Sequence, residues 1–312
     1  MSANQGNENG GQDNSTQGAS TKQLHKEYRE RIISTYRPLH RELYQMTPGS
    51  FFVPSFLNAI SENTEEGFRN IISEPSPGVL TFDMLQPQFC KMLVDEAENF
   101  ENWVRETRTR ILRPNTMNAY GSVLDDFGME RMLDKLMKDY ILPMSTIFFP
   151  EVGGATLDYH HGYVVEYGTN RDDHLDFHVD DSEVTLNVCL GELFTGGEMF
   201  FRGVRCDKHL DSESESGELY NYSQVPGRAV LHCGYHRHGA LSTTSGHRAN
   251  MLLWCRSSVF RKMRKYERNA SSWCRVCQKE KEEKQRRFAV QRTSSQTDSS
   301  SPCFSQTDSC SP

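Results

Sequence analysis

Apolar residues recur at two different spacings along the 312-residue chain, and the spacing changes near its middle. In the first half they recur every three or four positions, the period of an amphipathic α-helix. One such pattern starts at Thr21, and Pro38 inside it is predicted to kink or split the helix. Other helices are predicted from Pro87, and from Met129 to Tyr140, where Pro143 ends the last one. A short strand is predicted at 77–82. The apolar positions behind the three helices are Leu24, Tyr28, Ile32, Tyr36, Leu39 and Leu43; Phe89, Leu93, Ala97, Phe100 and Val104; and Met129, Met132, Leu133, Leu136 and Tyr140.

Beyond residue 160 the period becomes two, which is the spacing of a strand with one buried face. The predicted strands are short, rich in Val, Leu, Phe and Tyr, and separated by Gly, Asp and Ser: 163–167, 183–190, 198–201, 228–231 and 249–254. Several short strands after a helical half predict a mostly β fold with flanking α: an antiparallel barrel or sandwich buttressed by the N-terminal helices. The acidic, Ser-rich stretch 209–224 interrupts the strands and is predicted to be an exposed loop.

Both ends of the chain are polar, which divides it into four predicted parts. Residues 1–20 are rich in Gly, Asn, Gln and Ser and are predicted to be disordered. Residues 21–76 form a helical N-terminal extension, and 77–258 form the main domain. Residues 259–312 are basic and then Ser/Thr-rich, with a repeated Ser-Gln-Thr-Asp-Ser motif, and are predicted to be a mostly disordered tail.

Composition narrows the class of protein. The chain is 36% hydrophobic and 25% charged, as in ordinary globular proteins, and its net charge of −7 argues against a nucleic-acid partner overall. The basic stretch 256–292 is interpreted as a solvated helical face, or else a nuclear-import or nucleic-acid patch. No apolar run approaches the ~20 residues that span a bilayer. The first residues lack the features of a secretory signal, and nine scattered cysteines fit reduced thiols, so a cytoplasmic or nuclear location without a membrane is expected.

Candidate metal chemistry begins with the motif His178-x-Asp180. In a strand, positions i and i+2 share a face, so these two side chains can bind one ion while Val179 turns away. They supply a neutral nitrogen and an anionic oxygen, two of the three donors of a facial triad. Such a pair recurs by chance in many chains, so it needs a third donor from elsewhere.

The third donor is sought in residues 227–255, where four histidines compete: His232, His236, His238 and His247. Arg248 lies ten residues after His238, across a Thr-Thr-Ser-Gly turn that would place two strands side by side. This segment therefore offers both a metal ligand and a cation near it.

Together, these motifs resemble those of the Fe(II)/2-oxoglutarate-dependent dioxygenases, and within them the prolyl/lysyl-hydroxylase-type domain. The chain is most similar to intracellular 2-oxoglutarate and iron-dependent oxygenase domain-containing proteins. The resemblance covers 77–258 and implies a double-stranded β-helix, or jelly-roll, core. It implies that His178, Asp180 and His238 are the catalytic iron ligands, and that Arg248 binds the distal carboxylate of 2-oxoglutarate. Spacing to the arginine selects His238; His236 shares its strand face and merits mutagenesis, while His232 and His247 are interpreted as ordinary polar positions.

The resemblance also implies the reaction. An Fe(2+) centre would couple O₂ and oxidative decarboxylation of 2-oxoglutarate, to succinate and CO₂, with hydroxylation of a substrate. That substrate is expected to be a protein lysyl or prolyl side chain, although a small molecule or, less in keeping with the net charge, a nucleic acid remains an alternative. L-ascorbate is implied as the reductant. Tyr167 and Asn187 are candidates for binding the cosubstrate, and Thr185 shares a face with Asn187; cross-strand contacts are an equal alternative. Gly196 and Gly197 are interpreted as a permissive turn.

Two other classes of protein remain as alternatives. One is an enzyme with Zn²⁺ or another metal in the same triad, which would not require Arg248. The other is a non-catalytic jelly-roll binding protein, which would be free to lose a metal ligand.

Three further motifs are predicted to lie outside the site. His160 and His161 are adjacent, so they point to opposite faces of a strand. A second His-x-Asp, starting at His174, lies in a polar, turn-like stretch. Cys274-x-x-Cys277 has no second ligand pair downstream, so it is interpreted as an exposed cysteine pair rather than a zinc site.

Overall fold

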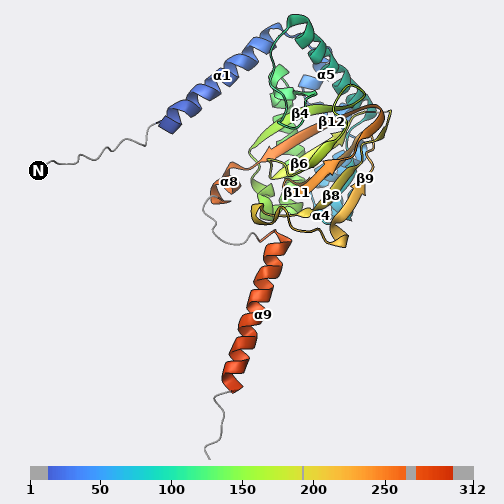
Figure 1. The fold of residues 1–312 in the computed structure, drawn as a ribbon. Helices are drawn as coiled ribbons and strands as arrows, with labels where there is room; N and C mark the ends of the chain where they lie inside the picture. Colours follow the sequence, from blue (N-terminus) through green and yellow to red (C-terminus); the bar gives the residue numbers. More distant parts are fainter. Residues whose placement is uncertain (1–12, 192, 265–271, 298–312) are drawn as a thin grey trace, which may run out of the picture.

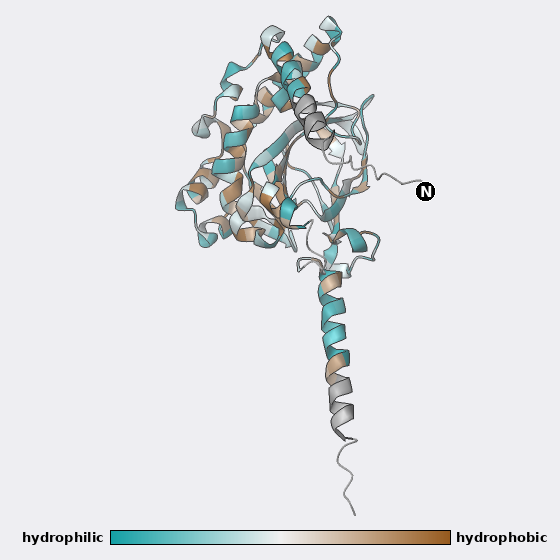
Figure 2. Cartoon of the chain, turned by 90° about the vertical axis from the view of Figure 1, so that its left-hand side faces the viewer, coloured by the Kyte–Doolittle hydropathy of each residue, from teal (hydrophilic) through white to brown (hydrophobic). Residues whose placement is uncertain are grey.

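The computed structural model describes residues 13–191, 193–264 and 272–297. In this part of the chain two antiparallel sheets lie face to face, and helices cover the outer side of the larger sheet (Figure 1; Figure 2). The larger sheet has the order β1-β2-β10-β6-β12-β4-β3, with β7 paired to β12, and the smaller has the order β5-β11-β8-β9. This arrangement confirms the predicted helix-buttressed, double-stranded β-helix fold.

The strands of the larger sheet are β1 (Ser73–Ser76), β2 (Val79–Asp83), β3 (Gly121–Val123), β4 (Tyr159–Gly168), β6 (Val184–Cys189), β7 (Phe194–Gly196), β10 (Arg228–Cys233) and β12 (Thr243–Arg256). Those of the smaller sheet are β5 (Leu175–His178), β8 (Met199–Val204), β9 (Leu219–Tyr222) and β11 (His236–Ala240). All of the predicted strands are present. The stretch 209–224 is only partly a loop, because it contains β9 and the buried Glu218.

Side chains on the central strands alternate between two environments, as the period of two requires. Those that point outward pack with the helices in one continuous apolar core, and most of those that point inward are polar or aromatic. On β6 the outward residues are Val184, Leu186 and Val188, and the inward ones are Thr185 and Asn187. On β12 the outward residues are Ala249, Met251, Leu253 and Cys255, and the inward ones are Arg248, Asn250, Leu252 and Trp254. The larger sheet thus separates the core from the space between the sheets.

The helices are α1 (Asp13–Thr35), α2 (Pro48–Phe51), α3 (Pro54–Glu62), α4 (Glu65–Arg69), α5 (Pro87–Thr107), α6 (Glu130–Leu136), α7 (Leu142–Phe148), α8 (Ser258–Arg264) and α9 (Arg275–Thr297). As predicted, α5 carries Pro87 in its first turn and buries Phe89, Leu93 and Phe100. The helical pattern around Pro38 is split, because α1 ends at Thr35 and the chain is extended before a short 3₁₀ turn, η1 (Arg41–Tyr44). No helix in the described part of the chain is long and apolar enough to cross a membrane.

Pro143 does not end the helix that precedes it, so this prediction was wrong. A π-helical turn, η3 (Met137–Ile141), follows α6, and Pro143 then lies in the first turn of α7. A proline lacks the amide hydrogen that an α-helix needs, but the first turn of a helix has no acceptor for that hydrogen anyway. The wider π-turn therefore lets the helical segment continue past the proline.

The predicted boundary at residue 76 does not separate two structural units. It divides the β1–β2 hairpin, whose strands pair from Ser73 to Thr81. The helices before this boundary share the apolar core of the main sheet. The centre of the Phe51 ring lies 4.2 Å from the centre of the Phe89 ring, and the centre of the Phe52 ring lies 4.5 Å from that of Tyr140. Residues 21–76 are therefore part of the same fold because their aromatic side chains fill its core.

Two predictions of disorder were wrong in part. Residues 13–20 are the first turns of α1, because each residue added to an existing helix gains a backbone hydrogen bond. Residues 258–264 and 275–297 are helical, and Glu-Arg pairs four residues apart, such as Glu282–Arg286, support α9. The predictions for 1–12, 265–271 and 298–312 lie outside the described residues.

Candidate metal and cosubstrate site

The side chains of His178, Asp180 and His238 converge at one end of the smaller sheet. His178 is the last residue of β5 and lies directly opposite His238 of β11 in the strand pairing. The Nε2 atom of His178 lies 3.4 Å from Oδ1 of Asp180, and Nε2 of His238 lies 3.7 Å from Oδ2. One donor atom from each residue lies within 4.8 Å of the others. We call these three residues the His-Asp-His triad.

Backbone carbonyls fix the tautomer of both triad histidines. Nδ1 of His178 lies 2.7 Å from the carbonyl oxygen of Asp176, and Nδ1 of His238 lies 2.8 Å from that of His236. A carbonyl can only accept, so each Nδ1 carries the proton and donates it. Each Nε2 then presents its lone pair toward Asp180, as in histidines that bind metals.

The Asp180 carboxylate is held on one side and free on the other. Thr185 donates its hydroxyl hydrogen to Oδ2 at 2.7 Å, while the buried Oδ1 has no hydrogen-bond partner among the described residues. Burial by itself raises the pKa of a carboxyl, but the His238 and His178 rings hold the pKa of Asp180 well below its usual range. A buried, ionised oxygen without a partner is costly, and a cation at this position removes that cost.

The electrostatics of His238 also suit a metal ligand. Its side chain is almost completely buried, and burial lowers the pKa of its ring to about 3. The imidazole is therefore neutral at pH 7. A neutral imidazole is the form that binds a metal. The donor set of two imidazole nitrogens and one carboxylate oxygen matches a facial triad for Fe(II), so the residues fit the ion.

A cavity of about 340 Å³ lies beside the triad, between the two sheets. Its walls include residues from both sheets and from the segment 115–118; the polar ones include His178, Asp180, His238, Arg248, Tyr167, Asn187, Asn250, Asn118 and Asn115. Apolar walls come from Val165, Leu175, Met199 and Leu252. This volume and this mixture are typical of small-molecule sites.

Arg248 of β12 brings a buried positive charge to the same cavity. Its Nε donates to the Thr243 hydroxyl at 3.2 Å, and Nη1 donates to Oδ1 of Asn250 at 2.9 Å. Among the described residues, the buried Nη2 has no hydrogen-bond partner and no carboxylate forms an ion pair with this guanidinium. Burial lowers the pKa of Arg248, but an arginine stays protonated at neutral pH. The site therefore presents a free donor on a buried cation, which fits a carboxylate ligand.

Tyr167 and Asn187 both reach this cavity, where they support Arg248 directly or through a neighbour. The guanidinium carbon lies 3.8 Å from the centre of the Tyr167 ring, a cation–π contact. Asn187 Oδ1 accepts a hydrogen bond from Nδ2 of Asn250 at 2.7 Å. Sequence reasoning missed Asn250, although its position two residues after Arg248 places it on the same face of the strand.

The Gly-Gly turn before β8 has the permissive role predicted for it, and one further constraint. Gly196 and Gly197 have φ values of +74° and +72°, which glycine adopts most easily. A Cβ atom on Gly197 would lie 2.7 Å from Nε of Arg248. A side chain at this position would therefore displace the guanidinium.

The other histidines of the segment 227–255 lie outside the triad. His232 is buried, with Nε2 unpartnered and 4.0 Å from Oδ2 of Asp180, so it borders the triad instead of being an ordinary polar position. His236 is buried against the Phe201 ring, 5.1 Å away, and burial lowers its pKa well below the usual value. His247 pairs with Glu166 at 3.2 Å.

The motifs that were set aside behave largely as expected. His160 contacts Asp125 at 3.1 Å, whereas Nε2 of His161 contacts the carbonyl oxygen of Pro114 at 2.7 Å, so the two rings serve different partners. In the upstream His-x-Asp, His174 is exposed and pairs with the neighbouring Asp173. The prediction of an exposed cysteine pair was wrong, because Cys274 and Cys277 are both buried.

A double-stranded β-helix with a His-Asp-His triad and a buried arginine in one cavity has the features of the Fe(II)/2-oxoglutarate oxygenase class. Comparison with known proteins gives the same class. Residues 32–154 match the model of the OGFOD2-like domain. The chain is 64% identical over 258 residues to the Arabidopsis thaliana 2-oxoglutarate and iron-dependent oxygenase domain-containing protein CP2, covering 83% of this chain and 66% of that protein.

It is 30% identical over 258 residues to the Homo sapiens 2-oxoglutarate and iron-dependent oxygenase domain-containing protein 2, covering 80% of this chain and 68% of that protein. The chain belongs to the family of 2-oxoglutarate and iron-dependent oxygenase domain-containing proteins, and spans about two thirds of the length of these relatives. Solved structures resemble it distantly: a prolyl 4-hydroxylase from Phytophthora capsici has a TM-score of 0.44 at 12% identity, covering 68% of this chain and 70% of that one.

Proposed function

We propose that this chain is an Fe(II)- and 2-oxoglutarate-dependent dioxygenase that hydroxylates a substrate. One observation carries the proposal most directly. Two buried groups without partners among the described residues, Oδ1 of Asp180 and Nη2 of Arg248, belong to residues that line one cavity. One needs a cation and the other an anion, which an iron ion and a dicarboxylate would supply together.

Each residue has a distinct part in this proposal. His178, Asp180 and His238 hold the iron, and Thr185 keeps the carboxylate in place by donating to Oδ2. Arg248 binds the distal carboxylate of 2-oxoglutarate, and Tyr167, Thr243 and Asn250 hold the guanidinium in place. When bound, iron and 2-oxoglutarate with O₂ supply the oxidising power, with succinate and CO₂ as coproducts.

The proposed substrate is a protein lysyl or prolyl side chain. The chain is 29% identical over 193 residues to the Rattus norvegicus multifunctional procollagen lysine hydroxylase and glycosyltransferase LH3, over 58% of this chain and 24% of that protein. L-ascorbate is proposed as the reductant that keeps iron in the Fe(II) state. We propose a cytoplasmic or nuclear location, since all seven described cysteines are free thiols.

Anaerobic spectroscopy tests the cofactor assignment without a known substrate. Fe(II) and 2-oxoglutarate added together should give a visible metal-to-ligand charge-transfer band in the wild type. His178→Ala and His238→Ala should abolish the band, because each removes one of three metal ligands. His174→Ala is the matched control, because it alters the upstream His-x-Asp motif, which is exposed.

Absence of the band in the folded wild type would overturn the proposal. Retention of the band in His238→Ala would transfer the third ligand to another histidine, with His232 the first to test. Substrate identity requires a second assay, in which lysine- and proline-containing peptides are screened for stimulated succinate release and for a gain of one oxygen atom by mass spectrometry. Omitting ascorbate from repeated turnover should reduce the yield.

A further inference from the structure

Four potential metal ligands meet where the loop after β8 contacts the start of α9. Cys206 and His209 come from this loop, and Cys274 and Cys277 come from the turn that opens α9. Their ligand atoms all lie within 4.8 Å of one another. We call these four residues the Cys₃His cluster.

Distances within the Cys₃His cluster match a shared tetrahedral ion. Nδ1 of His209 lies 3.3 Å from Sγ of Cys206, 3.4 Å from Sγ of Cys277 and 3.6 Å from Sγ of Cys274. The sulfurs of Cys206 and Cys277 are 3.6 Å apart. Ligands about 2.3 Å (sulfur) and 2.0–2.1 Å (nitrogen) from a tetrahedral zinc are about 3.5–3.8 Å from each other. These four distances are close to the spacing that zinc imposes.

His209 is oriented in the way that a metal-bound histidine usually is. Its Nε2 lies 3.2 Å from Oε1 of Glu280, one turn into α9. A carboxylate accepts the Nε2 hydrogen, which leaves the lone pair on Nδ1, facing the three sulfurs. All three cysteines are buried, and Trp273 and Val276 pack against them.

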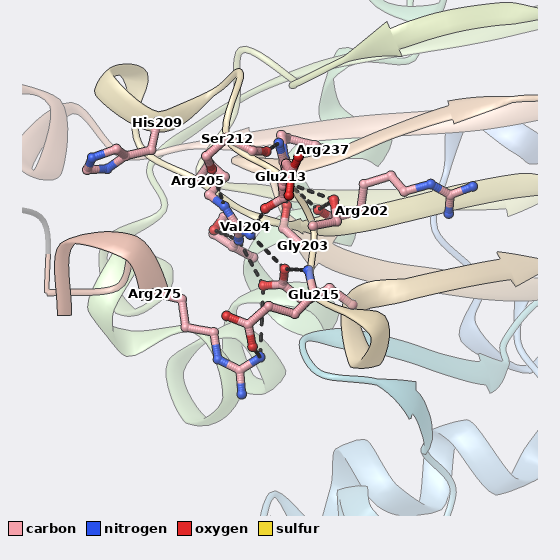
Figure 3. A network of polar contacts seen from close by, with 12 residues as sticks. Arg202, Gly203, Val204, Arg205, His209, Ser212, Glu213, Glu215, Arg237 and Arg275 are labelled. Atoms are coloured by element: carbon pink, nitrogen blue, oxygen red, sulfur yellow. Dashed lines mark hydrogen bonds and ion pairs between the residues drawn. The ribbon is translucent and has the colours of Figure 1, made fainter. Parts of the chain in front are cut away.

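The loop that carries Cys206 and His209 is held by buried arginines (Figure 3). Arg205 donates to both carboxylate oxygens of Glu218, at 2.8 and 2.6 Å. Arg237 of β11 donates to the backbone carbonyls of Leu210 and Ser212, at 2.8 and 2.5 Å. In Figure 3 the His209 ring points away from this network. The backbone is therefore fixed independently of any metal, which favours a preformed site.

We propose that Cys206, His209, Cys274 and Cys277 bind one zinc ion as a structural site. Three thiolates and one imidazole are a donor set typical of Zn²⁺, and four protein ligands fill a tetrahedral shell. No position is left for a substrate, so the ion joins segments and does no chemistry. It fastens α9, which extends away from the sheets in Figure 1, to the loop beside β8, and the thiol protons are released to solvent on binding. The proposal is independent of the oxygenase assignment.

Metal analysis of the full 312-residue chain, purified under reducing conditions, tests the site. The His238→Ala variant serves as background, because zinc bound in place of iron would otherwise be counted. About one zinc ion per chain is expected in this variant, and at least as much in the wild type. Cys277→Ser and His209→Ala should each lower the zinc content to a small fraction. Cys255→Ala is the matched control, since Cys255 is buried in the core away from the cluster and should leave the zinc content unchanged.

Cobalt substitution gives a second measurement that does not need a folded variant. Co²⁺ in the wild-type chain should give the intense visible bands of tetrahedral cobalt and a thiolate-to-cobalt charge-transfer band. The charge-transfer band cannot come from a His-Asp-His site, because that site has no sulfur ligand. The proposal is overturned if the reduced, folded wild type contains no zinc and gives no thiolate band. It is overturned equally if Cys277→Ser and His209→Ala both keep the full zinc content.

Discussion

The His-Asp-His triad and the Cys₃His cluster are two groups of potential metal ligands built in opposite ways. The triad has two histidines on the paired strands β5 and β11 and an aspartate just after β5, beside a cavity of about 340 Å³. The Cys₃His cluster has four donors on a loop and a helix start that lie far apart in sequence. Three donors leave coordination positions for other molecules, whereas four fill a tetrahedral shell. One arrangement suits chemistry, and the other suits holding the chain together.

The largest expected difference between the two groups is in turnover. Asp180→Ala removes the only anionic ligand of the triad, so succinate formation from 2-oxoglutarate should fall on the order of a thousandfold, since a catalytic metal supplies several kcal/mol. Zinc content should stay at the wild-type level in this variant. Cys277→Ser should show the reverse pattern, with zinc lost, a lower melting temperature and a far smaller change in succinate formation. A parallel loss of turnover in both variants would show that the two groups are not separate.

Arg248→Lys should have the next largest effect, and it should change only the binding of 2-oxoglutarate. Lysine keeps the charge but loses the planar fork, so the KM for 2-oxoglutarate should rise about 10–100-fold, the equivalent of one charge-assisted hydrogen bond. Iron affinity and zinc content should not change. Arg228→Lys, an exposed arginine paired with Asp83, is the control. An unchanged KM would remove Arg248 from cosubstrate binding.

Thr185→Val tests how strongly the buried surroundings of the triad hold its carboxylate. The substitution keeps the side-chain shape but removes the donor to Oδ2 of Asp180, so iron affinity should fall about 10–100-fold. A titration with Fe(II), followed by the charge-transfer band, measures this affinity. Thr195→Val, at an exposed hydroxyl, should leave the titration unchanged.

Removing the carboxylate that orients a ligand of the Cys₃His cluster should have the smallest effect on metal affinity. Glu280 accepts from Nε2 of His209, but its side chain is 62% exposed, so water can replace it in Glu280→Gln. Competition with a zinc chelator should show a loss of zinc affinity smaller than the loss of iron affinity in Thr185→Val. A larger loss at Glu280 would mean that an exposed partner orients its ligand as strongly as a buried one.

The two groups also differ in how far sequence alone could find them. His178 and Asp180 are two residues apart in sequence, and the period of a strand predicts that their side chains share one face, although β5 itself ends at His178 and Asp180 follows it. The Cys₃His cluster contains two short motifs, Cys206-x-x-His209 and Cys274-x-x-Cys277, and both are visible in the printed sequence. What joins them is the position of α9 against the loop after β8, which no local pattern encodes.

The difference between local patterns and contacts between distant segments also accounts for the errors in the predicted fold. The predicted strands and α5 are present because apolar residues recur at a regular spacing within each of these elements, whereas β9 was missed in a stretch predicted to be a loop. Pro143 was misjudged because a π-turn before it depends on packing around the helix and not on the proline itself. The boundary at residue 76 was wrong because Phe51 and Phe52 fill a core formed by residues much later in the chain.

Strand β12 has a consequence for how substitutions are tolerated over evolution and in mutational scans. Its fourteen residues face the core at Ala249, Met251 and Leu253, and the cavity at Arg248 and Asn250. Substitutions at the first set should lower protein abundance, and those at the second should lower activity at normal abundance. A scan along this one strand that scores abundance and activity separately should therefore give two signals of period two, offset by one residue.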